Sequence, residues 1–163
     1  ENNPSIKALA YQLYEKNGVL KREQVSEYLK NLGQNERKIL RELGVKFGRY
    51  HVFLHQLIKP EAVSLRTLLW KNFHQKYYNL KPPTFGLNFV DNKDLKNQNF
   101  MLLCGFEKFD AFFVRIDILE RLFMLIINSN SKEKSDIKVV PEMLNLLGCS
   151  KENFKKLLSL IHI

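Results

Sequence analysis

The apolar residues at the start of the chain recur with the period of an α-helix. One set spaced i, i+3, i+4 and i+7 predicts an amphipathic helix: Ile6, Leu9, Ala10 and Leu13. Asn17 and Gly18 tolerate the left-handed backbone that ends a helix, so they predict where this one stops. The spacing recurs in a second set, which predicts a helix that ends at Gly33: Val25, Tyr28, Leu29 and Leu32.

A third helix and a β-hairpin are predicted next. Asn35 can cap the helix, and we expect its three apolar residues to face the core: Ile39, Leu40 and Leu43. Val45–Phe47 and Tyr50–Leu54 have the composition of short strands, joined at Gly48–Arg49, where a leading glycine favours a type II′ turn. The predicted order of three helices and a hairpin is that of a winged helix-turn-helix.

The middle of the chain contains a helix and then a change of composition. Pro60 favours a helix that continues to Phe73, with an apolar stripe formed by Ala62, Leu65 and Leu69. Residues 79–99 contain prolines, a glycine and many Asn, Asp and Lys residues, which predict a linker or long loop. We therefore expect a winged-helix-like unit with its following helix at residues 1–78, and a second small α+β unit at residues 100–163.

The second unit is expected to end in a helix-turn-helix. Phe106–Ile116 predicts a strand pair around Asp110, and Asp117 with Glu120 predicts a capping box for the apolar helix Ile118–Ile127. Ten residues are too few to span a bilayer, so this helix should lie in a core. Residues 128–138 predict a mobile polar loop. Two further helices are expected after it, from these punctuating residues: Pro141, Gly148 and Ser150. The fold class expected is α+β, mainly α, with short hairpins.

The two ends of the chain have similar patterns. Leu32–Gly33 precedes a polar capping residue and a basic helix, and Leu147–Gly148 does the same. One interpretation is a duplicated helix-turn-helix whose second copy is cut off at Ile163. The other is that any two helical hairpins share this pattern.

The charge favours an anionic partner. The 163 residues include 26 Lys and Arg against 17 Asp and Glu, a net charge of +9, and such an excess attracts nucleic acids. An AT-rich genome, which encodes many Lys and Asn residues, is the alternative source of this charge. Cys104 and Cys149 are far apart, which favours reduced thiols in a cytoplasmic protein. The chain begins with Glu1 and has no signal peptide or long apolar run, so we expect a soluble piece of a longer protein without membrane contact.

Motifs for catalysis and metal binding are missing from the sequence. No G-x-x-x-x-G-K-[ST] loop cradles a phosphate, and no paired acidic motif follows a strand to hold Mg²⁺, so we expect no cofactor and no ATP hydrolysis in this chain. His51 and His55 are four residues apart, but in a predicted strand and without a second ligand pair. His74 and His162 are isolated. No serine or cysteine lies in a nucleophile turn, so we expect no enzyme activity.

The sequence does contain basic residues interleaved with aromatic ones. The candidate nucleic-acid-binding residues lie on the third helix and the hairpin: Arg37, Lys38, Arg41, Lys46, Arg49 and Tyr50. Cations meet phosphates and flat rings stack on unpaired bases, so this combination favours RNA. We expect the five cations to form one strip. A weaker group follows: Lys71, Lys76, Tyr77 and Tyr78. The alternatives are a solvated helix face for the third helix and simple packing for the tyrosine pair.

Three segments resemble one family in order and spacing. They are KNGVLKREQV followed by LGVKFGRYHVFLHQLIKPEAVSLRTLLW, then CGFEKFDAFFVRIDILERL, then PEMLNLLGCSKENF. Together they cover most of the chain, and they resemble the accessory region that follows the motor domains in bacterial superfamily 2 ATP-dependent RNA helicases related to the mitochondrial degradosome RNA helicase. Lys21 and His55 stand where the family pattern has prolines.

The resemblance implies an accessory domain that guides single-stranded RNA. It also implies motor domains before Glu1 that use ATP and Mg²⁺, and an exoribonuclease as a further partner. Two other classes stay open. An independent DNA-binding regulator would use the same winged helix on duplex DNA. A protein-docking module would use exposed aromatic residues such as Trp70, Phe73 and Tyr77.

Overall fold

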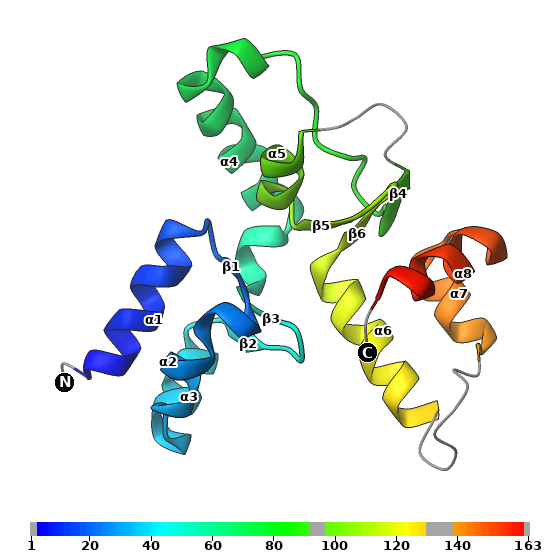
Figure 1. Ribbon diagram of the computed structural model, residues 1–163. Helices are drawn as coiled ribbons and strands as arrows, with labels where there is room; N and C mark the ends of the chain where they lie inside the picture. The colour runs from blue at the N-terminus through cyan, green and yellow to red at the C-terminus, as the bar shows by residue number, and fades with distance from the viewer. Residues whose placement is uncertain (1–2, 92–96, 130–138, 162–163) are drawn as a thin grey trace. The chain divides into compact units, whose positions relative to one another are not determined.

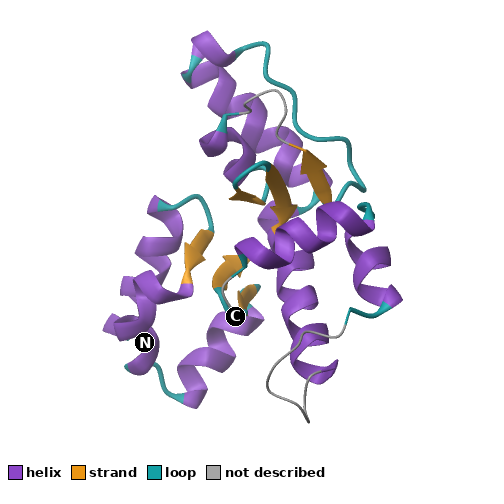
Figure 2. Cartoon of the chain, turned by 45° about the vertical axis from the view of Figure 1, so that its right-hand side comes forward, coloured by secondary structure: helices purple, strands orange, loops and turns teal. Residues whose placement is uncertain are grey.

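The computed structural model describes residues 3–91, 97–129 and 139–161 (Figure 1). It consists mainly of helices with two small antiparallel sheets (Figure 2), which agrees with the α+β, mainly α class expected from the sequence. Two compact units, Glu1–Val63 and Ser64–Ile163, each have their own sheet. Most of the predicted polar loop at 128–138, as well as His162, lies outside the described residues.

Unit 1, Glu1–Val63, contains helices and a three-stranded antiparallel sheet. Its elements, in chain order, are α1 (Pro4–Glu15), β1 (Val19–Lys21), the 3-10 helix η1 (Arg22–Val25), α2 (Ser26–Lys30), α3 (Gln34–Glu42), β2 (Val45–Phe47), β3 (His51–Leu54), the 3-10 helix η2 (His55–Ile58) and the start of α4 (Pro60–Phe73). The sheet order is β1-β3-β2, and Val52 in the central strand pairs with Leu20 on one side and Phe47 on the other.

The predicted helices and hairpin of unit 1 are present, but the second helix is shorter than expected: Val25 ends the 3-10 helix η1, and α2 ends at Lys30 rather than at Gly33. The element that the sequence did not reveal is β1. The turn at Asn17–Gly18 ends α1 as expected, with φ values of 54° and 82°. Val19–Lys21 is too short to show an alternating pattern, and it becomes a strand because β3 pairs with it.

Several local predictions for α3 and the hairpin are wrong. The helix begins one residue before Asn35, so Gly33 is its N-cap. Of the three apolar residues expected in the core, Leu40 is 2% exposed, but Ile39 is 46% and Leu43 66% exposed. Leu43 lies past the last helical turn, where the helical period no longer sets its direction. Gly48 has no positive φ, so the hairpin does not close with a type II′ turn.

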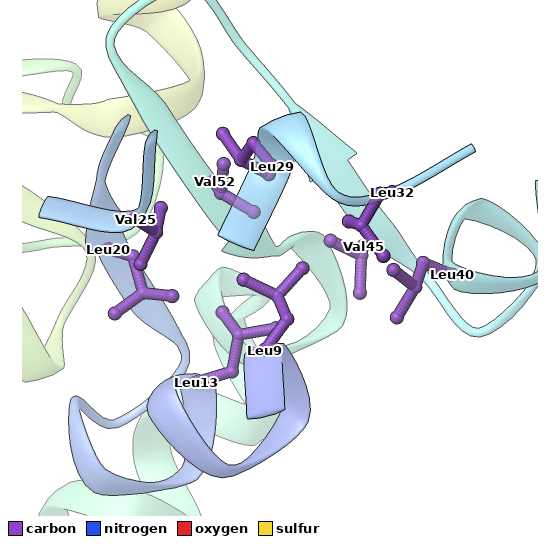
Figure 3. Close-up of a cluster of buried hydrophobic side chains, with 9 residues drawn as sticks. All are labelled: Leu9, Leu13, Leu20, Val25, Leu29, Leu32, Leu40, Val45 and Val52. Carbon is purple, nitrogen blue, oxygen red and sulfur yellow. The ribbon is translucent and has the colours of Figure 1, made fainter. Parts of the chain in front are cut away.

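The core of unit 1 lies between the helices and one face of the sheet (Figure 3). Leucines from α1, α2, the α2–α3 turn and α3 meet a valine from η1 and apolar residues from the three strands there. All are at most 4% exposed: Leu9, Leu13, Leu20, Val25, Leu29, Leu32, Leu40, Val45 and Val52. Burial of each such side chain contributes about 1.5–3 kcal/mol. This core fixes α3 against the hairpin, and so it positions the candidate site.

Unit 2, Ser64–Ile163, begins within α4. Its other elements are the 3-10 helix η3 (Gln75–Tyr77), β4 (Phe89–Asp91), α5 (Gln98–Leu103), β5 (Phe106–Phe109), β6 (Phe112–Arg115), α6 (Ile116–Ser129), α7 (Pro141–Leu147) and α8 (Lys151–Leu160). The sheet order is β4-β6-β5. Asp110 takes a φ of 44° in the predicted β5–β6 turn, and Gly148 takes 66° at the end of α7.

Two predictions for the second half of the chain need correction. The boundary expected at residues 79–99 lies earlier, between Val63 and Ser64, and Phe89–Asp91 within that segment is a strand that pairs with β6. The capping box at Asp117 is also wrong, because α6 begins at Ile116. The Asp117 carboxylate does accept from the Ile118 amide at 2.9 Å, but it also pairs with the Arg115 guanidinium at 2.7 Å.

Of the apolar stripe predicted for α4, the two leucines face solvent and Ala62 is half-buried. Leu65 and Leu69 are each 58% exposed, whereas Val63 and Thr67 are buried. Trp70 on the half-buried side packs against Phe100 of α5, with ring centroids 5.6 Å apart. The prediction failed because the buried face of α4 includes the polar residue Thr67. Its apolar positions therefore do not recur with a helical period that the sequence would show.

Candidate nucleic-acid interface

Arg37, in the first half of α3, directs its guanidinium toward the end of α2. Its Nη2 donates to the Leu29 carbonyl oxygen at 2.7 Å, and its Nε donates to the Leu32 carbonyl oxygen at 3.2 Å. The last carbonyls of a helix lack partners within the helix, and a cation is favourable beside them. Arg37 therefore holds the α2–α3 corner together, a role that the sequence did not reveal.

Arg41 lies one helical turn after Arg37, and both guanidiniums approach the ring of Phe47 in β2. The distances from the guanidinium carbon to the ring centroid are 6.0 Å for Arg37 and 5.6 Å for Arg41. These are cation–π distances, which add attraction between α3 and the hairpin. Arg41 is otherwise exposed, so its guanidinium can also meet an anion.

Lys38 and Lys46 are both exposed, but Lys46 lies on the other face of the hairpin sheet from Phe47 and Arg41. Side chains alternate along a strand, so Lys46 points away from the face on which its neighbour Phe47 contacts Arg41. Lys46 instead shares a face with Phe53, its partner in the register. Because side chains alternate along β2, Lys46 is separated from Arg41, although we expected both to belong to one strip of cations.

The loop between β2 and β3 carries Arg49 and Tyr50. The Arg49 guanidinium lies 6.0 Å from the centre of the Tyr50 ring. Arg22 fastens this loop: its amide donates to the Tyr50 carbonyl oxygen at 2.8 Å, and its Nη1 donates to the Gly48 carbonyl oxygen at 2.6 Å. Sequence reasoning missed Arg22, because its partner is 26 positions away and no local pattern indicates the contact.

The outer surface of α3 is mixed rather than uniformly basic. Ile39 and Leu43 are exposed on it, beside Lys38, Arg41 and Glu42. The exposed basic residues of α3 and the β2–β3 loop are therefore Lys38, Arg41 and Arg49.

The second group of basic and aromatic residues lies in unit 2. Trp70 stacks with His74 at 4.5 Å and with Tyr77 at 5.3 Å between ring centroids. Tyr77 is half-buried in this cluster, in line with the packing alternative, and the Lys76 ammonium lies 4.7 Å above its ring. Tyr78, by contrast, is 69% exposed.

Metal-ligating side chains do not gather in residues 3–91, 97–129 and 139–161. No cluster of three His, Cys, Asp or Glu residues able to hold a metal ion is found there. Burial raises the pKa of the Cys104 thiol to about 12, a shift that the nearby Arg66 opposes. This thiol therefore stays protonated at neutral pH and is a poor nucleophile. Within the same residues, none of the helices is both long enough and apolar enough to cross a bilayer.

Comparisons with protein-family models, with curated proteins and with solved structures find no match to this chain.

Proposed function

We propose that this chain is an accessory domain that binds single-stranded RNA and guides it for the motor domains of an ATP-dependent RNA helicase. The observation that carries the proposal is the surface of α3 and the β2–β3 loop, where Lys38, Arg41 and Arg49 are exposed around a rigid corner. Phosphates need cations held in fixed positions, and the core beneath α3 supplies that rigidity. The motor domains, which use ATP and Mg²⁺, and an exoribonuclease are the partners in this proposal.

Unit 1 in this proposal is a winged helix-turn-helix. Its support is the order α1, β1, α2, α3, β2, β3, with β1 paired to β3 in the same sheet as the hairpin. In such a unit, α3 is the recognition helix and the β2–β3 loop is the wing. The Arg22 hydrogen bonds to Gly48 and Tyr50 then fix the wing to η1.

The test is binding of a fluorescent single-stranded RNA to the 163-residue chain over a range of salt concentrations. With about four phosphates neutralised, log K should fall against log salt with a slope of about −3. The triple variant Lys38→Glu, Arg41→Glu, Arg49→Glu should lose most of the binding. Arg37 is left unchanged because its guanidinium bonds the carbonyls of Leu29 and Leu32.

The matched control reverses three exposed lysines elsewhere, Lys7, Lys59 and Lys151, with the same change in net charge. It should bind RNA far better than the α3 and loop variant. Both variants should stay folded because surface changes cost little, although the α3 and loop variant also loses the Arg41–Phe47 contact, which contributes about 0.5–1 kcal/mol. Equal loss in the two variants would mean that net charge alone attracts RNA. Tighter, sequence-dependent binding to duplex DNA would favour the DNA-binding regulator.

A protein-docking module is the second candidate, and the exposed face of α4 favours it. Leu65 and Leu69 are 58% exposed and Phe73 is 84% exposed. Exposed apolar patches on a helix commonly mark protein interfaces. Two results together would favour this candidate. The chain would bind no RNA at any salt concentration, and Leu69→Ser and Phe73→Ser substitutions would abolish binding of a protein partner.

A further inference from the structure

A cleft in unit 2 lies outside the α3 surface. Its volume is about 280 Å³, and it opens between α4 and the segment that follows η3. Leu68, Lys71 and Asn72 line it from the helix, and Tyr78 and Lys81 line it from the segment. Positions i, i+3 and i+4 share one face of a helix, so the three α4 residues form a continuous wall.

The cleft is held in shape by hydrogen bonds within unit 2. The Lys71 ammonium donates to the Leu80 carbonyl oxygen at 3.2 Å, which ties the segment to the helix. The Tyr78 amide donates to the Gln75 carbonyl oxygen at 3.1 Å, and the Leu80 amide donates to the Tyr77 carbonyl oxygen at 3.0 Å. A preformed cleft loses little conformational entropy when a ligand enters.

The lining has the groups that an unpaired nucleotide needs. Two lysines, Lys71 and Lys81, line the cleft, and none of its lining residues carries a carboxylate. Tyr78 is 69% exposed and offers a ring for stacking, and Leu68, 52% exposed, offers an apolar surface beside it. The Asn72 side-chain amide can both donate and accept, as the edges of bases do.

We propose that this cleft holds one unpaired nucleotide of single-stranded RNA, with the base stacked on Tyr78 and the phosphate beside Lys81. The inference rests on the proposed function, and it adds a second contact made by the other unit. Stacking requires a base that is not already paired, so the cleft selects single strands over duplexes. An acidic peptide would satisfy the lysines but would leave the stacking surface of the tyrosine unused.

The decisive variants are Tyr78→Ala and its matched control Tyr78→Phe. Binding of a fluorescent oligouridine to the full chain should weaken about fivefold to a hundredfold with alanine, the range expected for one lost base stack. The phenylalanine variant keeps the ring and should stay within about twofold of the parent. Binding of a blunt RNA duplex should change with neither. Trp70 fluorescence and thermal melting check that unit 2 stays folded.

A second pair of variants tests the phosphate. Lys81→Ala should flatten the slope of log K against log salt by about 0.7, the contribution of one phosphate on a single strand. Lys108→Ala, which removes an exposed lysine from β5 of the same unit, should leave the slope unchanged.

The outcomes separate this inference from the proposed function. If Tyr78→Ala binds oligouridine like the parent while the α3 and loop variant does not, the cleft proposal is wrong and RNA binding by unit 1 stands. If Tyr78→Ala weakens duplex and single strand equally, base stacking is wrong. If the parent binds no RNA, both proposals fail together. If Tyr78→Phe weakens binding as much as alanine, the hydroxyl and not the ring is the contact.

Discussion

The α2–α3 corner of unit 1 and the α7–α8 corner of unit 2 have the same sequence pattern but are built differently. In both, a buried leucine precedes a glycine: Leu32 before Gly33 and Leu147 before Gly148. Gly148 has a φ of 66° and ends α7, and the Ser150 side chain then caps α8 by accepting from the Asn153 amide. Gly33 has an ordinary φ of −72° and is itself the N-cap of α3, without a side-chain cap.

The basic residues of the two corners differ as well. Arg37 of α3 bonds the backbone carbonyls of Leu29 and Leu32 at the α2–α3 corner, and Arg41 lies over Phe47. In α8, Lys156 pairs with Glu152 at 2.9 Å on the helix surface, and Lys155 is exposed. Arginine's fork can satisfy two carbonyls at once, whereas lysine is a point charge that stays hydrated. The comparison shows that a repeated pattern of basic residues does not imply a repeated surface.

The largest effects should come from the apolar side chain that anchors each corner. Leu40→Ala should cost about 2–5 kcal/mol in unit 1, and Phe154→Ala about 3–5 kcal/mol in unit 2, since both side chains are at most 2% exposed. Leu43→Ala is the control, and at 66% exposed it should change stability by no more than about 0.5 kcal/mol. Urea unfolding followed by circular dichroism measures these changes. A cost for Leu43→Ala equal to that for Leu40→Ala would contradict the assignment of the core face.

The next effect concerns the cations of the two corners. Arg37→Ala removes two hydrogen bonds, one to the Leu29 carbonyl of α2 and one to the Leu32 carbonyl that follows it. It should cost about 1–2 kcal/mol, at the low end for charged partners because the side chain is half-buried. Lys155→Ala on α8 should cost no more than about 0.5 kcal/mol. The same unfolding experiment compares them, and equal costs would mean that the two corners use their basic residues alike.

The two glycines should respond differently to a methyl group. Gly148→Ala places a side chain at a φ of 66°, where no atom lies within 4 Å, so backbone strain alone should cost about 1–2 kcal/mol. Gly33→Ala, with its extended backbone, should change stability by less than about 1 kcal/mol, although the flexible Glu36 carboxylate must move aside. Thermal melting of both variants checks this difference. Similar costs would indicate that Gly33 is also needed for its conformation.

The smallest effect is the pH dependence of the α8 surface pair. The hydrogen bond from Lys156 lowers the pKa of Glu152 from its ordinary value of 4.5. Because the folded-state pKa is the lower one, the pair contributes to stability above pH 4.5 and loses that contribution as pH falls through the lowered pKa. An NMR titration of the Glu152 carboxyl should show its pKa returning toward 4.5 in Lys156→Gln, but not in Lys155→Gln. No change in Lys156→Gln would contradict the pairing.

The candidate site could be predicted in part. Exposed basic residues on α3 and the loop follow from their spacing in the sequence, and Lys38, Arg41 and Arg49 are exposed as the helix and hairpin patterns indicate. The inward orientation of Arg37 could not be predicted, because it depends on carbonyls that only the α2–α3 corner brings near. The separation of Lys46 from Arg41 depends on the register of β2, which a three-residue strand does not reveal.

The sequence by itself determined several helices with strong periodicity, some of their end signals and the strands of the two hairpins. These features depend on neighbours along the chain: apolar spacing in α1, the turn at Asn17–Gly18 and the cap at Ser150. The tertiary structure alone decided that Val19–Lys21 and Phe89–Asp91 are strands, that α4 divides between the units, and that its leucines face solvent. A three-residue strand depends on hydrogen bonds to its partner strand, and the buried face of a helix depends on the surface that packs against it. Neither feature can therefore be predicted from the pattern of neighbouring residues.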